Sequence, residues 1–416
     1  MGHVIRFVGM EAYMKRNNIL KMSLSFGLLS SMLVGCSSTQ TTSSVTEVSV
    51  VEDDSEVTAT INLWANEDGE WLKTELKAFQ KIHPKWDLTF ETTVVSEDEV
   101  ASKALTDVDS VADVYFYNND EIPTLVSSNV LAELGGDTLT TIQNNNDQTT
   151  VSTVTYNSAV YGIPYTTDTY VLYYDKTVFS KVDVKNLDTM LEKGKVGISL
   201  NDYDILASFY LGNGCTLSNT IDFSGDKATN VTNYLVDLVS NKNFVKVDTT
   251  SVDLLTNGKA NAIFGDSSDY DAVKEALGED NVGIAIAPKY TLNGSEIQLK
   301  PLVSSSAIGV NPNSENLKVA VALANFLASS SSQQDHFDID GVIPTDTTLD
   351  VRETRIAKIH TNTVKNIGVA IPTKDMTNCW TAAQTMGNEI VNGTVTHDNA
   401  SEKTEAMNVS MNVTGE

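Results

Sequence analysis

Residues 162–176, which read GIPYTTDTYVLYYDK, carry the pattern that decides the fold. Four tyrosines lie in this stretch, and three of them fall within the strand-like core YVLYY at 170–174. Successive side chains on a strand point to opposite faces, so Tyr170 and Tyr174 share one face and Tyr173 takes the other. We therefore predict that these three tyrosines lie in a core. The role of Asp168 at the mouth of this strand depends on how the rest of the chain is organised.

The N-terminus has the pattern of a targeting segment. Basic residues at 15–21 precede an apolar run, 22–34, which is too short to span a bilayer but suits the core of a signal peptide. The run ends in LVGC, which resembles the lipobox of bacterial lipoproteins. That resemblance implies cleavage of residues 1–35 and a lipid anchor on Cys36. The Ser/Thr-rich residues 36–57 are predicted to be a flexible tether.

The charge of the chain excludes some classes of partner. The whole chain has a net charge of −27. Removing residues 1–35 takes away four basic residues and one acid, which leaves 24 basic against 54 acidic residues and a charge of −30. Such a surface repels phosphate backbones and anionic lipid headgroups, so we expect no nucleic-acid partner. The five histidines have no zinc-type spacing, and no cofactor or metal is expected.

Short apolar strands alternate with amphipathic helices along most of the remaining chain. This alternation predicts parallel sheets covered by helices on both faces. The predicted strands are 60–64, 88–95, 112–117, 197–200, 260–264, 282–287 and 306–310. The predicted helices are 72–82, capped by Asp68, then 97–106, 120–126, 204–211, 231–239, 317–327, 352–364 and 378–391. The polar tail beyond Gly393 is expected to be loose at its end.

The order of these pieces resembles the maltose/maltodextrin class of solute-binding proteins of bacterial ABC transporters. The stretches that carry the resemblance are INLWANEDGEWLKTELKAFQKIHP from residue 61, ADVYFYNNDEIPTLVSSNVLAEL from 112, YGIPYTTDTYVLYYDKTVF from 161, NGKANAIFGDSSDY from 257 and IPTKDMTNCW from 371. The resemblance as a whole covers roughly residues 58–412, nearly the whole mature chain.

That resemblance implies a two-lobed α/β fold, periplasmic-binding-protein-like, with discontinuous lobes and a hinge. The first lobe would comprise 58–166 and 303–345, and the second 167–302 and 346–412. The crossings near 166–169 and 302–305 would form the hinge. Because ligands prefer interdomain clefts and the carboxyl ends of parallel strands, Asp168 would lie at the hinge edge of the site.

Eight residues are predicted to contact the ligand on the strength of this resemblance. Sugars offer hydroxyl groups at their rim and apolar faces, so a site needs polar acceptors and aromatic platforms. The candidates are Trp64, Asn66, Asp68, Tyr117, Asp120, Asp168, Tyr203 and Trp380. For Trp64 a core position is an equally good interpretation, and Tyr165 is left open between core and ligand.

Two departures from the family pattern affect the choice of ligand. Glu121 stands where relatives commonly carry a basic residue, which removes a cationic donor. After ANAIFG the maltodextrin type presents a Trp, whereas this chain continues with DSSDY. Tyr270 could replace that ring, or the subsite could be polar.

These observations predict a monomeric lipoprotein on the extracytoplasmic face of the cell membrane, which captures an oligosaccharide and delivers it to ABC permease subunits. Another sugar or a polyamine remains an alternative ligand. A secreted carbohydrate-active enzyme is the rival of another class, with carboxylate pairs such as Asp120 and Glu121, but no nucleophile elbow, metal motif or P-loop is present. An adhesive or structural lipoprotein is a further rival. Cys215 and Cys379 are expected to stay unpaired, although a disulfide between them is left open.

Overall fold

The computed structural model describes residues 56–218, 220–247, 251–351 and 354–413. The predicted signal peptide, Cys36 and most of the predicted tether lie outside these residues. No helix among the described residues is long and apolar enough to cross a membrane.

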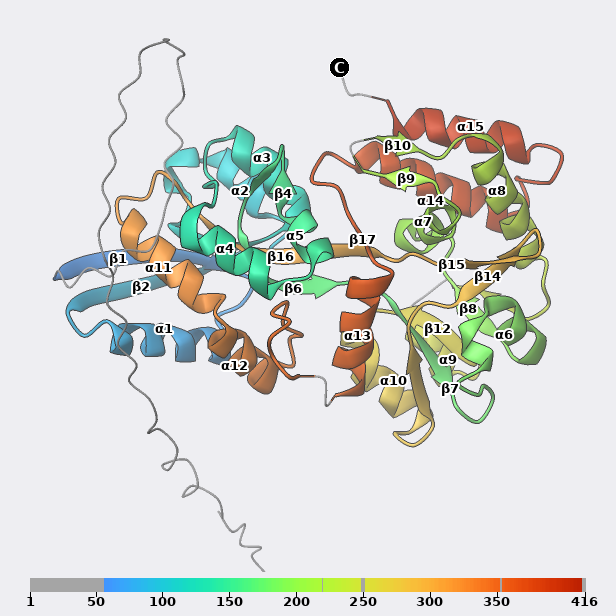
Figure 1. The fold of residues 1–416 in the computed structure, drawn as a ribbon, viewed down its shortest axis with the longest axis horizontal. Coiled ribbons are helices and arrows are strands. Elements are labelled where there is room, and N and C mark those ends of the chain that lie inside the picture. Colours follow the sequence, from blue (N-terminus) through green and yellow to red (C-terminus); the bar gives the residue numbers. More distant parts are fainter. Residues whose placement is uncertain (1–55, 219, 248–250, 352–353, 414–416) are drawn as a thin grey trace, which may run out of the picture. The chain divides into compact units, whose positions relative to one another are not determined.

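The first sheet has six strands and is built mainly from the N-terminal part of the chain (Figure 1). β1 (Val57–Ala65) pairs in parallel with β2 (Trp86–Val94) and β3 (Val114–Asn118). β16 (Leu302–Val310) runs antiparallel to β3 and to β6 (Ile163–Asp168), and β17 (Val369–Ala370) pairs with its first residues. We call this sheet with the helices packed on it the first lobe. These helices are α1 (Glu70–Ile82), α2 (Val100–Thr106), α3 (Ile122–Ser127), α4 (Gly136–Asn145), α5 (Gln148–Thr153), α11 (Leu317–Leu327) and α12 (Ser330–Asp340).

The second sheet has five strands in the order β11-β8-β12-β7-β13. Their bounds are Phe244–Lys246, Val196–Ile198, Ala262–Gly265, Val171–Asp175 and Val282–Ala285. We call this sheet with its helices the second lobe. The helices are α6 (Leu187–Lys193), α7 (Tyr203–Gly212), α8 (Gly225–Val239), α9 (Ser251–Thr256), α10 (Tyr270–Leu277), α13 (Arg355–Asn366), α14 (Thr377–Val391) and α15 (Ala400–Met411).

Each lobe has its own buried core. The core of the first lobe is one cluster that includes Tyr165 and Ala307. The second lobe has a cluster on each face of its sheet, with Tyr170 and Tyr174 on one side and Tyr173 on the other. This division confirms the prediction that the three tyrosines of the aromatic strand are core residues on opposite faces of β7.

The chain passes between the lobes at β6 and at β16. The core contacts change lobe between Tyr165 and Tyr170, and between Leu302 and Ala307. At these crossings the two strands are paired, with Asp168 opposite Ser304. A β-bulge between Ser306 and Ala307 interrupts the ladder there. The lobe boundaries at 166, 302 and 345 stay a prediction.

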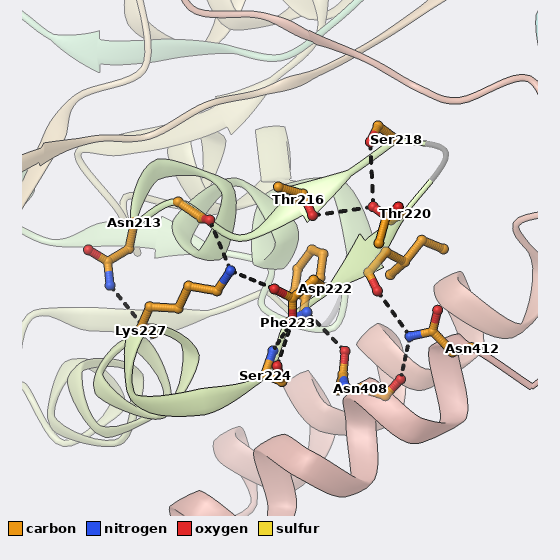
Figure 2. A network of polar contacts seen from close by, with 12 residues as sticks. Asn213, Thr216, Ser218, Thr220, Asp222, Phe223, Ser224, Lys227, Asn408 and Asn412 are labelled. Atoms are coloured by element: carbon orange, nitrogen blue, oxygen red, sulfur yellow. Dashed lines mark hydrogen bonds and ion pairs between the residues drawn. The ribbon is translucent and has the colours of Figure 1, made fainter.

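Most of the C-terminal segment is a helix that the sequence did not predict, and the last residues, 414–416, which were expected to be loose, lie outside the described residues. α15 packs against α14 and α8, and it buries Ala400, Thr404, Met407 and Met411. Its polar residues also bond to the second lobe. Asn408 Oδ1 accepts the amide of Phe223 at 2.9 Å, and Asn412 Nδ2 donates to the carbonyl of Ile221 at 3.1 Å (Figure 2).

Small hairpins complete the structure. They pair β4 (Thr155–Tyr156) with β5 (Ala159–Val160), β9 (Thr216–Leu217) with β10 (Ile221–Asp222), and β14 (Lys289–Leu292) with β15 (Ser295–Gln298). Short 3-10 turns form at η1 (Val108–Ser110), η2 (Asn119–Glu121), η3 (Asp183–Lys185) and η4 (Ser267–Asp269). Cys215 and Cys379 are both buried and unpaired, as expected.

Candidate functional site

A pocket of about 240 Å³ lies beside the crossing strands and the ends of second-lobe strands. Asp168 and Thr169 line it where β6 ends, Ser199 follows β8, and Asp266 follows β12. We call it the hinge pocket. Its full lining is Asp168, Thr169, Tyr170, Ser199, Asp202, Asp204, Ile205, Ser251, Phe264, Gly265, Asp266, Asp269, Leu302, Ser304 and Ile371. Carboxyl ends of strands in an α/β sheet are the usual place for a ligand.

Asp168 is the last residue of β6 and is exposed at the mouth of the aromatic strand. Desolvation raises its pKa from 3.8 to about 6, and the charges of Asp266 and Asp269 contribute to the same shift. Both of these aspartates follow β12 and line the same pocket. Asp168 therefore lines a pocket with two further aspartates, and its contact with a ligand stays a prediction.

The N-terminus of α7 brings two more carboxylates to the pocket. Asp202 caps the helix, and its side chain accepts the amide of Asp204 at 2.9 Å. Burial raises the pKa of Asp204 well above its ordinary range, and Asp202 and Asp168 add to this effect. One carboxylate oxygen of Asp204, Oδ1, is buried without a hydrogen-bond partner.

Tyr203 and Trp380 form an aromatic platform in the second lobe. Tyr203 is the first residue of α7, and Trp380 lies in the first turn of α14. Their rings are stacked, with centroids 4.2 Å apart and planes 18° apart, and both side chains are half-buried. Partly exposed aromatic rings provide the kind of surface that packs against the apolar face of a sugar. Sequence reasoning named both residues, and the structure brings them together.

The charges of carboxylates from both lobes raise the pKa of the Tyr203 hydroxyl in this platform. Desolvation is the largest cause of the raised pKa of Tyr203, and the charges of Asp204 and Asp202 raise it further. Asp120 of the first lobe and Asp168 at the crossing make smaller contributions. Asp120 lies in the turn η2 and is exposed, with a pKa that is also raised by desolvation.

The structure contradicts the prediction that Tyr117 contacts ligand. Its side chain is 0% exposed in the core of the first lobe, and its hydroxyl donates to the carbonyl of Tyr161 at 3.0 Å. The first four residues of β3, which point alternately to its two faces, are all buried, so both faces of the strand are covered at Tyr117. A strand in the middle of a sheet has no open face unless a layer of helices is missing.

Trp64 is also mainly a core residue. It is 5% exposed and contacts Tyr115 at 6.3 Å between ring centroids. Lys103 Nζ lies 5.1 Å from the centre of the Trp64 ring. Tyr165 is buried as well, and its hydroxyl donates to the carboxylate of Glu97. The core interpretation therefore holds for both side chains in this structure.

Asn66 and Asp68 follow β1 and are exposed. Asp68 forms an ion pair with Lys73, with 2.8 Å between Oδ2 and Nζ. The prediction that Asp68 caps the first helix is wrong, because the N-cap of α1 is Gly69 and receives no side-chain bond. Asp68 uses its carboxylate for Lys73 instead.

Glu121 takes part in local structure. Its carboxylate accepts the amide of Ala101 in the first turn of α2. Desolvation nevertheless raises its pKa to about 7, and Asp120 and Asp98 contribute. Tyr270 begins α10, and Lys274 Nζ lies 5.2 Å from the centre of its ring. Tyr270 is not among the residues that line the hinge pocket.

Sequence reasoning missed several polar residues of the hinge pocket. They are Ser199, Asp202, Asp204, Asp266, Asp269 and the hydroxyl of Tyr170. The density of acids directly after two predicted strands, in NDYD at 201–204 and GDSSD at 265–269, was the available signal. Among the described residues, no group of three or more His, Cys, Asp and Glu could hold a metal ion.

The comparisons with known proteins agree with this two-lobed α/β fold. Residues 76–362 match the model of the bacterial extracellular solute-binding protein family. A solved structure described as a complex with acarbose is 41% identical, with a TM-score of 0.76, over 85% of this chain and 99% of that one. No curated protein matches the chain. The chain therefore belongs to the bacterial extracellular solute-binding proteins.

More distant structures show the same fold. The maltodextrin-binding protein MalE1 from L. casei BL23 has a TM-score of 0.80 at 22% identity, over 86% of this chain and 99% of that one. The maltose-binding periplasmic protein MalE from Listeria monocytogenes, solved with maltose, has a TM-score of 0.69 at 20% identity. It covers 86% of this chain and 100% of its own.

Proposed function

We propose that the protein captures an oligosaccharide of the maltodextrin type. The observation that carries this proposal is the stacked pair Tyr203 and Trp380 beside the hinge pocket. It combines an aromatic surface for the apolar face of a sugar with carboxylates that accept hydroxyl groups. The 41% identical relative was solved with acarbose, which supports a ligand of this class.

Exposed polar residues of the first lobe complete the proposed site. Asn66, Asp68 and Asp120 lie at the carboxyl ends of β1 and β3. They would contact the sugar from the first lobe while Tyr203 and Trp380 contact it from the second. Such a division of contacts gives the ligand a higher affinity for a closed arrangement, which biases the hinge toward closure.

The proposal also covers delivery of the sugar to a transporter and the location of the protein at the membrane. The closed protein would dock, as a monomer, on the permease subunits of an ABC transporter. A lipid on Cys36 would hold it on the outer face of the cell membrane, since two acyl chains anchor a protein firmly whereas one holds it weakly. A Cys36→Ser variant that stays in the membrane fraction after cell fractionation would contradict the anchor.

Calorimetric titration of the purified protein with maltotetraose tests the ligand class. We expect saturable binding of one molecule per chain, with the sugar recovered intact afterwards. Intact sugar also fits the relatives, which are named as binding proteins. Sustained release of shorter sugars would instead support a carbohydrate-active enzyme. The absence of any heat or shift in melting temperature would reject maltodextrins as ligands.

A further inference from the structure

The hinge pocket carries more negative charge than a neutral sugar requires. Five aspartates line it: Asp168, Asp202, Asp204, Asp266 and Asp269. None of its described lining residues is a lysine, an arginine or a histidine. Buried charges without a counter-ion are costly, so a ligand that closes over these carboxylates has to compensate them.

Two buried polar atoms in the pocket lack a hydrogen-bond partner. The hydroxyl of Tyr170 is one, and only 7% of that side chain is exposed. Asp204 Oδ1 is the other, and Asp204 lines the pocket beside Tyr170. An unsatisfied buried polar group costs free energy, and such groups in folded proteins commonly await a ligand or water. Here the hydroxyl of Tyr170 can donate and accept, and Asp204 Oδ1 can accept a hydrogen bond from a ligand.

Among the described residues, no cationic group contributes to the raised pKa values of four of these aspartates, Asp168, Asp202, Asp204 and Asp269. The charge of Asp266 tends to raise the pKa of His360 in α13, but burial of that ring has the larger effect and lowers its pKa to about 4. His360 is therefore neutral at physiological pH. Tyr173 donates its hydroxyl to the carbonyl of Asp266, which leaves the carboxylate of Asp266 for other partners. Within the described part of the chain, that carboxylate accepts hydrogen bonds from the amide and the hydroxyl of Ser268.

The form of the acidic cluster indicates the kind of cation. The five carboxylates come from three elements and do not converge as the ligands of a metal ion would. An ammonium group has several N–H donors that can bond to separated acceptors, and its charge-assisted bonds are stronger than neutral ones. A hydroxyl group on the same ligand would satisfy Tyr170.

We propose, building on the oligosaccharide function above, that the hinge pocket selects a sugar unit that carries a protonated amine. Asp204 and its neighbouring aspartates are the counter-ions of the ammonium, and the hydroxyl of Tyr170 bonds to a hydroxyl of the same ligand. The Tyr203 and Trp380 platform holds the neutral part of the chain. The preferred ligand is thus an amino-oligosaccharide.

Paired titrations of the purified protein test this selection. Maltotetraose is the neutral probe, and acarbose is a four-ring relative in which one bridging oxygen is replaced by a secondary amine. We expect acarbose to bind at least about tenfold more tightly than maltotetraose at neutral pH, which corresponds to about one pKa unit of added interaction. Titrations in two buffers of different ionisation enthalpy should show proton uptake with acarbose alone.

Two variants separate the pocket from general electrostatics. Asp204→Asn keeps the shape of the side chain, and it should reduce the preference for acarbose while leaving maltotetraose affinity equal or higher. Asp280→Asn removes the same charge from an exposed residue outside the pocket, and it should keep the full preference. Asp202→Asn, which retains a capping oxygen for α7, serves as a second pocket variant.

Each outcome decides between the two proposals. Equal affinity for both sugars, or an acarbose preference that persists in both pocket variants, overturns the amine selection and leaves maltodextrin capture standing. Proton uptake with maltotetraose as well would show that the carboxylates neutralise themselves, which also overturns it. Binding of spermidine with no binding of either sugar would reject both proposals in favour of a polyamine.

Discussion

Trp380 and Tyr203 are the residues whose geometry most resembles a sugar platform. Their rings are stacked at 4.2 Å and only half-buried, so they pack against the core of the second lobe and still leave surface accessible to a ligand. A ring in this position gains van der Waals contact with a sugar face at a low cost in side-chain entropy.

Replacing Trp380 with alanine should weaken binding of maltotetraose by about 1–3 kcal/mol, or roughly 5- to 150-fold in Kd. The physical reason is the loss of one ring of the stacked pair. Calorimetry measures the change, and Tyr203→Phe, which keeps its ring, is the matched control. Wild-type affinity in Trp380→Ala, with an unchanged melting temperature, would remove this residue from the site.

The raised pKa of Asp168 predicts how the stability of the fold depends on pH. Its pKa is raised from 3.8 to about 6, mainly by desolvation and then by Asp266 and Asp269. A carboxyl whose folded-state pKa is raised destabilises the fold above that pKa, and the penalty fades as pH falls through about 6 towards 4. Asp168→Asn removes the charge, so the variant should melt at a higher temperature than the wild type near neutral pH.

The gain in melting temperature should shrink at a pH of about 4.5, where the folded wild type already holds a proton on Asp168. Differential scanning calorimetry at the two pH values checks this, with the exposed Asp280→Asn as control. An equal gain at both pH values would show that the effect does not come from ionisation.

Individual residues also show the limit of sequence reasoning. The alternation in 170–174 correctly predicted which tyrosines are buried, because a strand has only two faces. Tyr117 was misassigned because its spacing from Asp120 suits a ligand contact, whereas it is buried by neighbouring segments of the fold, among them Tyr161, whose carbonyl accepts its hydroxyl. Those neighbours are distant in sequence, and no local pattern reveals them.

At the level of elements, the close approach of α14 to the loop after β8 fixes the aromatic platform. Gly387 lies in α14, and an added Cβ there would stand 1.8 Å from the carbonyl oxygen of Leu200. The same helix carries Trp380, and the same loop leads to Tyr203. Only a residue without a side chain allows these two elements to pack at this distance.

Gly387→Ala should therefore force α14 away from that loop. Overpacking of a core costs about 1–3 kcal/mol, and the shift should also separate the stacked rings and weaken sugar binding. Thermal melts and calorimetric titration measure the two effects. Asn388→Ala, at an exposed position of the same helix, is the control. A Gly387→Ala protein with wild-type stability and affinity would show that this approach does not position the platform.

The elements with strong periodicity were predictable, and those held by tertiary contacts were not. The predicted helix over 317–327 coincides with α11, whose apolar residues repeat at helical spacing. α15 was missed because it is polar, with its buried face formed by Ala400, Thr404, Met407 and Met411. Packing on α8 and α14 stabilises it, and tertiary context of this kind outweighs local propensity.

At the level of the whole molecule, two cores joined by paired crossing strands explain how a solute could be captured. β6 and β16 pass between the lobes side by side, with Asp168 paired to Ser304 at the crossing. A few residues at element ends can absorb the rotation of a hinge. Contacts from both lobes to one ligand would then favour the closed arrangement.

Small-angle scattering of the protein with and without saturating maltotetraose tests this account most directly. The account predicts a smaller radius of gyration with the sugar, because closure brings the lobes together, and Trp380→Ala should need a sugar concentration roughly 5- to 150-fold higher to show the same change. Superimposable curves for the wild type with and without sugar would contradict capture by interlobe closure.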